Sequence, residues 1–293
     1  MGIFEQWFVY ALAAAGFAAL TTIFAKVGLR GVESNLATAV RTMAALLLAW
    51  IFVFIIPSQP IGEMGEIASS TWLLIVLSGL STGGAWLCRF KALKLQNVNK
   101  VTPITKTSTI LTMILAIIFL GDFVGPFTVL AMVLMGIGTW LMLEFKKSTT
   151  QAQGKTWLVF ACLAALFASL TALLGYAGVQ DINAILWTAL RTIIVAAVSW
   201  LMVFITKEGK GIKTIGAKNF FVLILSGFAT GGSWIFFYQA LQVGSASLVV
   251  PIDQLSIVLT MGFAALFLKE KFSRRSVIGL AVLTAGILLP VFV

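Results

Sequence analysis

The chain has 293 residues, of which 60% are hydrophobic and only 10% are charged. A soluble domain carries roughly 25% charged residues on its surface, so this composition excludes a water-soluble globular protein and favours one whose surface faces lipid. The net charge of +10 does not predict a nucleic-acid partner, because the basic residues are spread over short connections between apolar runs.

Ten apolar runs follow one another along the chain, each near the ~20 residues that a helix needs to cross a bilayer. We place them at 7–29, 35–56, 70–93, 99–119, 124–144, 156–178, 183–205, 218–241, 246–267 and 274–292. They lack the alternation of barrel strands, and only helices or closed barrels satisfy the backbone in hydrocarbon. The sequence therefore predicts an all-α polytopic membrane protein whose first run is a retained span.

Basic residues fall on one side of this predicted topology. One set of connections contains Arg30, Lys94, Lys146, Lys147, Lys155, Lys207, Lys210, Lys213, Lys218, Lys269, Lys271, Arg274 and Arg275. The other set, with both termini, contains Glu5, Glu63, Glu66, Asp122 and Asp181 and no Lys or Arg. Because basic loops stay in the cytoplasm, we expect both termini outside it, in an inner or plasma membrane.

The chain also repeats itself at an offset of about 150 residues. The arginine of Arg41-Thr42 matches that of Arg191-Thr192, LSGLSTGGAW (77–86) matches LSGFATGGSW (225–234), and VTPI (101–104) matches VVPI (249–252). Each half holds five spans, an odd number, so the second half enters the membrane from the opposite side. Such inverted repeats are typical of secondary transporters, which rock around a site near the midplane.

These matched residues resemble the EamA family of the drug/metabolite transporter superfamily. The resemblance rests on the arginine early in the second helix of each half, the A-L end of the third, the proline early in the fourth, and the segment 237–289. It implies two five-helix units, at 1–147 and 156–293, joined by a connection at 148–155. It also implies export of amino acids or related metabolites, although some relatives import.

Two charged residues lie deep in predicted spans, where charge is costly and marks a functional hypothesis. In the repeat, ITKTS (104–108) faces IDQLS (252–256), so Lys106 and Thr105 come from the first half and Asp253 and Gln254 from the second. Lys106 and Asp253 either form an ion pair that holds the halves together, or contact a charged or zwitterionic substrate. Asp253 is also a candidate carrier for a coupling proton.

Prolines and arginines recur at matched positions nearby. Pro103 and Pro251 precede the charged pair and predict helix kinks, which point to a transporter's site; tolerated kinks are the alternative. Arg41 and Arg191 predict structural anchors that snorkel to head groups or cap a loop carbonyl.

Aromatic residues follow the matched glycine pairs Gly83-Gly84 and Gly231-Gly232. Trp86, Phe90, Trp234 and Tyr238 predict an aromatic-walled cavity suited to apolar groups or cations. A packing role for these rings is the alternative.

The favoured function is a secondary transporter for a small organic solute, with the bilayer and that solute as partners, with proton or ion coupling open, and as a monomer or homodimer. A flippase for a lipid-linked metabolite on the same fold is the alternative. The chain has no histidine, which removes the commonest metal ligand and general base. We therefore expect no metal, no cofactor and no enzyme activity.

Overall fold

The computed structural model describes residues 3–29, 31–56, 64–96, 101, 104–121, 125–142, 156–267 and 272–292. Within these ranges the regular elements are all helical, which confirms the predicted all-α class. The helices are α1 (Ile3–Gly28), α2 (Ser34–Ile55), α3 (Ser69–Leu95), α5 (Ser108–Leu120), α6 (Pro126–Leu141), α7 (Thr156–Val179), α8 (Ala184–Thr206), the 3-10 helix η2 (Glu208–Thr214), α9 (Ala217–Val243), α10 (Ala246–Asp253), α11 (Leu255–Phe267) and α12 (Arg274–Phe292).

The helices have the length and composition of membrane spans. In the described residues, seven helical segments are long and apolar enough to cross a bilayer. They are Gln6–Gly28, Ser34–Ile55, Ser69–Leu93, Thr156–Val179, Ala184–Thr206, Ala217–Val243 and Ala246–Phe263. Two shorter apolar helices, Ile104–Leu120 and Pro126–Leu141, lie at the fourth and fifth predicted spans.

Large hydrophobic side chains face outward on these helices. Phe54, Phe119 and Phe204 are 68%, 70% and 81% exposed. In water such side chains would form a large aggregation-prone surface, whereas lipid tails solvate them. The outer surface therefore fits a hydrocarbon environment, as the composition predicted.

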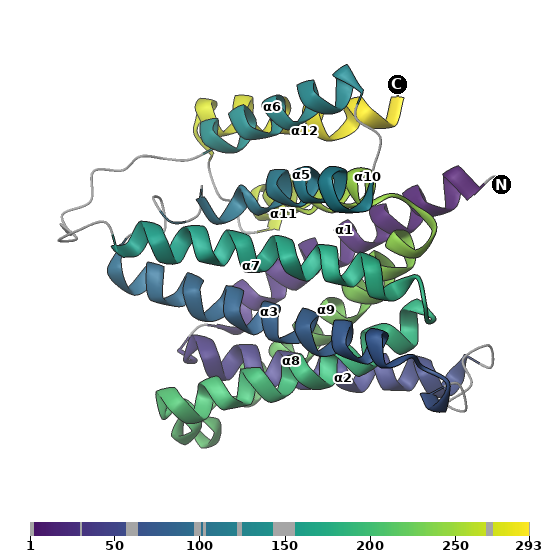
Figure 1. Ribbon diagram of the computed structural model, residues 1–293. Helices are drawn as coiled ribbons and strands as arrows, with labels where there is room; N and C mark the ends of the chain where they lie inside the picture. The colour runs from purple at the N-terminus through teal and green to yellow at the C-terminus, as the bar shows by residue number, and fades with distance from the viewer. Residues whose placement is uncertain are drawn as a thin grey trace.

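The helices stack in layers (Figure 1). α6 and α12 pair at one edge, α5, α10 and α11 lie beneath them, and the remaining helices form the bulk of the bundle. Segments distant in sequence make the main contacts, since α1 packs along α9, α7 along α3, and α2 along both α8 and α9. The fold is thus held by contacts between the helices within residues 3–141 and those within residues 156–292.

The α6–α12 pair depends on backbone contact at glycine. A Cβ on Gly138 would meet the backbone of Leu283 and Gly279, and a Cβ on Gly279 would meet the backbone of Met142 at 2.7 Å. Small residues let membrane helices approach this closely, so these two positions fix how α12 lies on α6.

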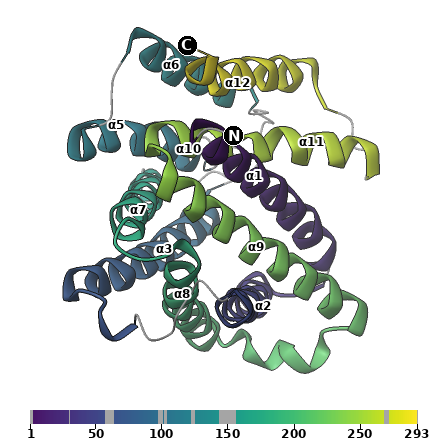
Figure 2. The same cartoon turned by 90° about the vertical axis from the view of Figure 1, so that its right-hand side faces the viewer.

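The ninth predicted span, 246–267, is broken into two helices that run end to end (Figure 2). Gln254 N–H donates to the Pro251 carbonyl at 2.9 Å, and Ile257 N–H donates to the Gln254 carbonyl at 2.9 Å. These are 3-10-type bonds. The break therefore lies just after Asp253 rather than in the turn before Pro251, where a proline kink is usually placed.

Candidate functional site

Two adjoining cavities lie between the helices in the middle of the bundle. The first, cavity A, has a volume of about 380 Å³ and is walled by α1, α5, α7, α8, α9 and α10. The second, cavity B, has a volume of about 290 Å³ and is walled mainly by α3, α7 and the segment before α5. They share the lining residues Ser108, Ala168, Thr171, Arg191, Trp234 and Gln254, so the two form one connected site.

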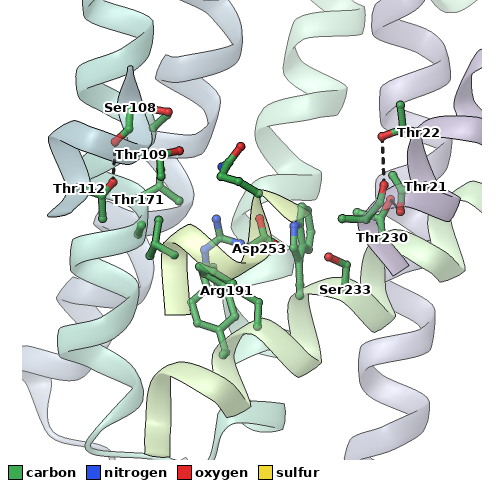
Figure 3. A pocket seen from close by; sticks show the side chains of 18 residues that line it. Thr21, Thr22, Ser108, Thr109, Thr112, Thr171, Arg191, Thr230, Ser233 and Asp253 are labelled. Atoms are coloured by element: carbon green, nitrogen blue, oxygen red, sulfur yellow. Dashed lines mark hydrogen bonds between the residues drawn. The ribbon is translucent and has the colours of Figure 1, made fainter. Parts of the chain in front are cut away.

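Hydroxyl side chains make up most of the polar wall of cavity A (Figure 3). They are Thr21, Thr22, Ser108, Thr109, Thr112, Thr171, Thr230 and Ser233. Several already donate to the carbonyl one turn before them in their own helix, as Thr112 does to Ser108 at 2.9 Å and Thr230 does to Ser226 at 2.7 Å. Their oxygens still have lone pairs for a further donor.

Charged side chains reach the site from separate elements. Asp253, the last residue of α10, lines cavity A, while Lys106 and Arg89 line cavity B. Lys106 lies beside Arg89 in the wall of cavity B and within electrostatic range of the Asp253 carboxylate. The repeat predicted that Lys106 and Asp253 lie in one region, and they line two adjoining cavities. Whether they pair with each other or bind substrate stays a prediction.

Arg191 stands in the wall between the two cavities. Its Nε donates to Ser78 Oγ at 3.0 Å and its Nη2 donates to Thr82 Oγ1 at 2.5 Å, both on α3. The guanidinium carbon lies 5.4 Å from the ring centres of Trp234 and Tyr238. These hydroxyl and ring partners differ from the head groups or loop carbonyl that the sequence suggested.

The hydrogen bonds around Arg191 have counterparts around Arg41. Arg41 Nη2 donates to Thr230 Oγ1 at 3.2 Å on α9, as Arg191 does to Thr82 on α3. Ser226 donates to the Thr21 carbonyl, and Ser78 donates to the Thr171 carbonyl. The Thr21–Thr230 and Thr82–Thr171 hydroxyl pairs are both 3.4 Å apart. Each arginine thus joins a helix of one sequence half to one of the other.

The predicted aromatic residues reach the site to different extents. Trp234 lines both cavities, Tyr238 lines cavity A, and Trp86 lines cavity B. Tyr238 is also packed edge-on against Trp187, with ring centres 5.9 Å apart. The side chain of Phe90 lies outside the described residues. Both roles weighed for these rings, cavity wall and packing, apply to Tyr238.

The remaining predicted residues flank this wall. Thr105 lines cavity B and Gln254 lines both cavities. Pro251 is buried within α10, beside the break at Gln254, and Pro103 lies outside the described residues. Arg41 is absent from the linings of both cavities.

The hydroxyl wall of cavity A and the place of Arg89 in cavity B were not predicted from the sequence. Arg89, in the last two turns of α3, lines cavity B. The signal that was available was the repeat itself, because Thr82 and Thr230 fall on each other in the matched segments 77–86 and 225–234.

Comparisons with known proteins agree with this architecture. A curated protein named an uncharacterized transporter in the cobO 3'region, from a Sinorhizobium species, is 38% identical over 141 residues, which make up 48% of this chain and 99% of that protein. A solved structure described only as the crystal structure of a protein has a TM-score of 0.74 and 14% identity, and the match covers 98% of this chain and 96% of that one; it supports the fold alone.

The sequence profile of one family matches the chain twice. The EamA-like transporter family matches residues 6–144 and again residues 155–292. The resemblance stated from the sequence is therefore confirmed, and the helices described above are those of a multi-pass membrane protein. The chain belongs to the EamA-like transporter family.

Proposed function

We propose that this protein is a secondary transporter that exports a small organic metabolite, an amino acid or related solute, by alternating access. In this proposal the moving parts are two inverted five-helix repeats, at 1–147 and 156–293, joined by the connection at 148–155. Membership of a transporter family points to transport rather than catalysis. The solute binds in cavities A and B, between the repeats.

The observation that carries the proposal is a charged site enclosed by apolar helices. Arg191, Lys106 and Asp253 line two connected cavities in a chain whose outer surface suits lipid. Ionisable groups at membrane depth mark substrate or ion pathways. The helix break directly after Asp253 supports this reading, because interrupted helices form the sites of many transporters.

The duplicated hydrogen bonds support two repeats that move against each other. Arg191–Thr82 and Arg41–Thr230 both cross between the family matches at 6–144 and 155–292. Bonds of this kind break and form when two related bodies rock. Asp253 is our candidate for carrying a coupling proton, because it is the acidic side chain among the lining residues of cavity A.

Solute flux into liposomes containing the purified protein tests the proposal. Labelled amino acids and related metabolites should exchange across the membrane with the wild-type protein, and Asp253→Asn should abolish the exchange without lowering the unfolding temperature. Asp181→Asn is the matched control, because Asp181 accepts a hydrogen bond from Thr71 away from both cavities. An absence of flux for a broad metabolite panel, together with an Asp253→Asn effect on stability alone, contradicts the proposal.

A flippase for a lipid-linked metabolite is the second candidate, and one feature favours it. An apolar groove of about 340 Å³ between α1, α2 and α9 is lined by residues such as Phe17, Leu48 and Phe236, and has room for a hydrocarbon chain. Its lining residues are not those of cavities A and B. A lipid would have to place its head group and its chain in separate compartments, so a soluble metabolite fits the site better.

A further inference from the structure

The guanidinium of Arg191 is only partly used by the protein. The residue is 2% exposed, and its Nε and Nη2 are taken by Ser78 and Thr82. Its Nη1 is buried without a hydrogen-bond partner in the described part of the chain. The flanking rings of Trp234 and Tyr238 stabilise the positive charge, but a ring face is a weak acceptor for an N–H. A buried charged donor left in this state is costly, so its retention needs a reason.

The place of Arg191 supplies that reason. It is shared by both cavities, so any solute that moves through the site passes it. Figure 3 shows the Arg191 side chain and Asp253 among the residues around cavity A. The guanidinium cannot reorient freely, because two hydroxyls on α3 and two rings on α9 hold it. A planar, fixed donor edge of this kind matches a carboxylate.

The charges around the site favour the same ligand. Arg89, Lys106 and Arg191 line the two cavities, against the single carboxylate of Asp253 in their linings. An anionic group therefore finds an attractive field, and Asp253 is left to receive an ammonium group. A volume of about 380 Å³ for cavity A lies at the small end of ligand sites, which suits a solute of amino-acid size.

Arg41 shows that anchoring alone does not make such a site. It donates to Thr230 as Arg191 donates to Thr82, yet it lines neither cavity. The two arginines occupy matched positions in the sequence and in the hydrogen-bond pattern. Each has one buried nitrogen without a partner in the described residues, Nε in Arg41 and Nη1 in Arg191. They differ in access to the cavities, and this difference makes Arg41 an internal control for the role of the cavity.

We propose that Arg191 is the residue that selects the solute, by binding its carboxylate through the unpartnered edge of the guanidinium. The transported class is then small carboxylates, with amino acids among them, and their amides are excluded. This inference rests on the proposed transport function but concerns binding, which can be measured without transport.

The test compares acids with their amides in the purified full-length protein. The standard L-amino acids, short aliphatic carboxylates and the corresponding amides are added to detergent-solubilised protein, and the rise in unfolding temperature is recorded for each. The same pairs are then used as competitors in liposome exchange. Arg191→Lys and Arg191→Gln are compared with Arg41→Lys and Arg41→Gln. The acid-to-amide preference is taken within each variant, so loss of folded protein does not affect it.

We expect at least one acid, and no amide, to stabilise the wild-type protein. Loss of a hydrogen bond to a charged group should weaken acid binding about ten- to a hundredfold in Arg191→Gln, and less in Arg191→Lys, which keeps the charge. Both Arg41 variants should keep the wild-type preference. Equal binding of acids and amides, no acid binding at all, or an unchanged preference in Arg191→Gln overturns the inference. Exchange of amides alone overturns it while leaving transport intact; acid binding through Arg191 without exchange contradicts transport and leaves the inference standing.

Discussion

The buried guanidinium of Arg191 has three kinds of neighbour in place of water. Two hydroxyls accept its hydrogen bonds, two aromatic faces lie beside its guanidinium, and the residue lines both cavities. No one of these would compensate the loss of hydration for a guanidinium in an apolar bundle. Because Arg191 on α8 donates to two hydroxyls on α3, it also links the two halves of the sequence. The packing of the helices and the proposed binding therefore depend on the same side chain.

Removing one hydroxyl separates these roles. Thr82→Val keeps the shape of the side chain but leaves Nη2 of Arg191 without its acceptor, which should destabilise the protein by about 1–3 kcal/mol. Thr230→Val does the same to Arg41. Unfolding temperatures should fall in both variants. Thr230 also lines cavity A, so affinity can change in either variant, but the preference for acids over amides should weaken only in Thr82→Val. Equal losses of that preference in the two variants would show that the geometry of Arg191 has no special part in it.

The sequence predicted the arginine pair but not its partners. Offsets of 150 and 148 residues place Arg41 on Arg191 and Thr82 on Thr230, yet nothing in those offsets says that Arg191 reaches Thr82 on α3. That contact depends on α8 lying beside α3, which is a matter of packing between distant helices. For the same reason the repeat could assign Lys106 and Asp253 to one region, but it could not assign Asp253 to the wall of cavity A and Lys106 to that of cavity B.

At the scale of elements, one helix pair is held by tight backbone contact and another is joined through a short 3-10 junction. α6 and α12 are joined through backbone contacts at Gly138 and Gly279, which leaves no space for adjustment. α10 and α11 meet at a 3-10 junction after Pro251 and Asp253, a geometry that yields more readily than a continuous helix. The first pair suits a fixed frame and the second a part that moves. The apolar runs predicted the helices, seven of which in the described residues are long and apolar enough to cross a membrane. They did not predict the position of this break, because the proline alone places it a turn earlier.

The close contact between α6 and α12 can be tested at two neighbouring glycines of α6. A side chain at Gly138 would collide with the backbone of α12, whereas at Gly136 it would meet only the end of Ile110, at 3.4 Å. Gly138→Val should lower stability by at least about 1–3 kcal/mol, as overpacking does, and Gly136→Val should have a much smaller effect. Unfolding temperatures of the two purified variants measure the difference. Similar losses in both would mean that α6 and α12 are not held by this close approach.

The junction can be tested at Pro251. Pro251→Ala restores an N–H to a buried helix, so a normal bond to the Ser247 carbonyl becomes available and stability should stay equal or rise. If the break serves movement, exchange in liposomes should fall severalfold in the same variant. A variant with unchanged exchange and raised stability would assign the proline to a tolerated kink, the alternative that the sequence left open.

At the scale of the whole molecule, side-chain amides link one end of the bundle. Gln242 Nε2 donates to the carbonyls of Val179 and Ile182 at 3.1 and 3.0 Å, and Gln180 Nε2 donates to that of Leu241 at 2.9 Å. These bonds tie the α7–α8 turn to the end of α9. At offsets of 150 and 148 residues the sequence has Arg30 and Lys94 instead. The matched positions of the two sequence halves therefore carry amides in one half and basic residues in the other.

The hydrogen bonds of Gln180 and Gln242, here called the amide clamp, lie at the end of the bundle opposite the one that the basic connections predict to be cytoplasmic. Surface labelling can test this orientation. The basic connections should face the cytoplasm, so the clamp should close the opposite end. Cys88 and Cys162, which are free thiols, are first replaced by serine. In cells, Lys218→Cys should then react with a membrane-impermeant maleimide only after permeabilisation, and Glu66→Cys should react without it.

The clamp itself is tested by adding Gln242→Leu to Ser233→Cys, whose position lies in cavity A. The new thiol should then react faster with a reagent added from the Glu66 side, because the amide hydrogen bonds of Gln242 are lost. Reaction at Lys218 in intact cells would reverse the orientation. An unchanged rate at Ser233 would place the closure of that end in the apolar packing of Trp187 and Tyr238 rather than in the amides.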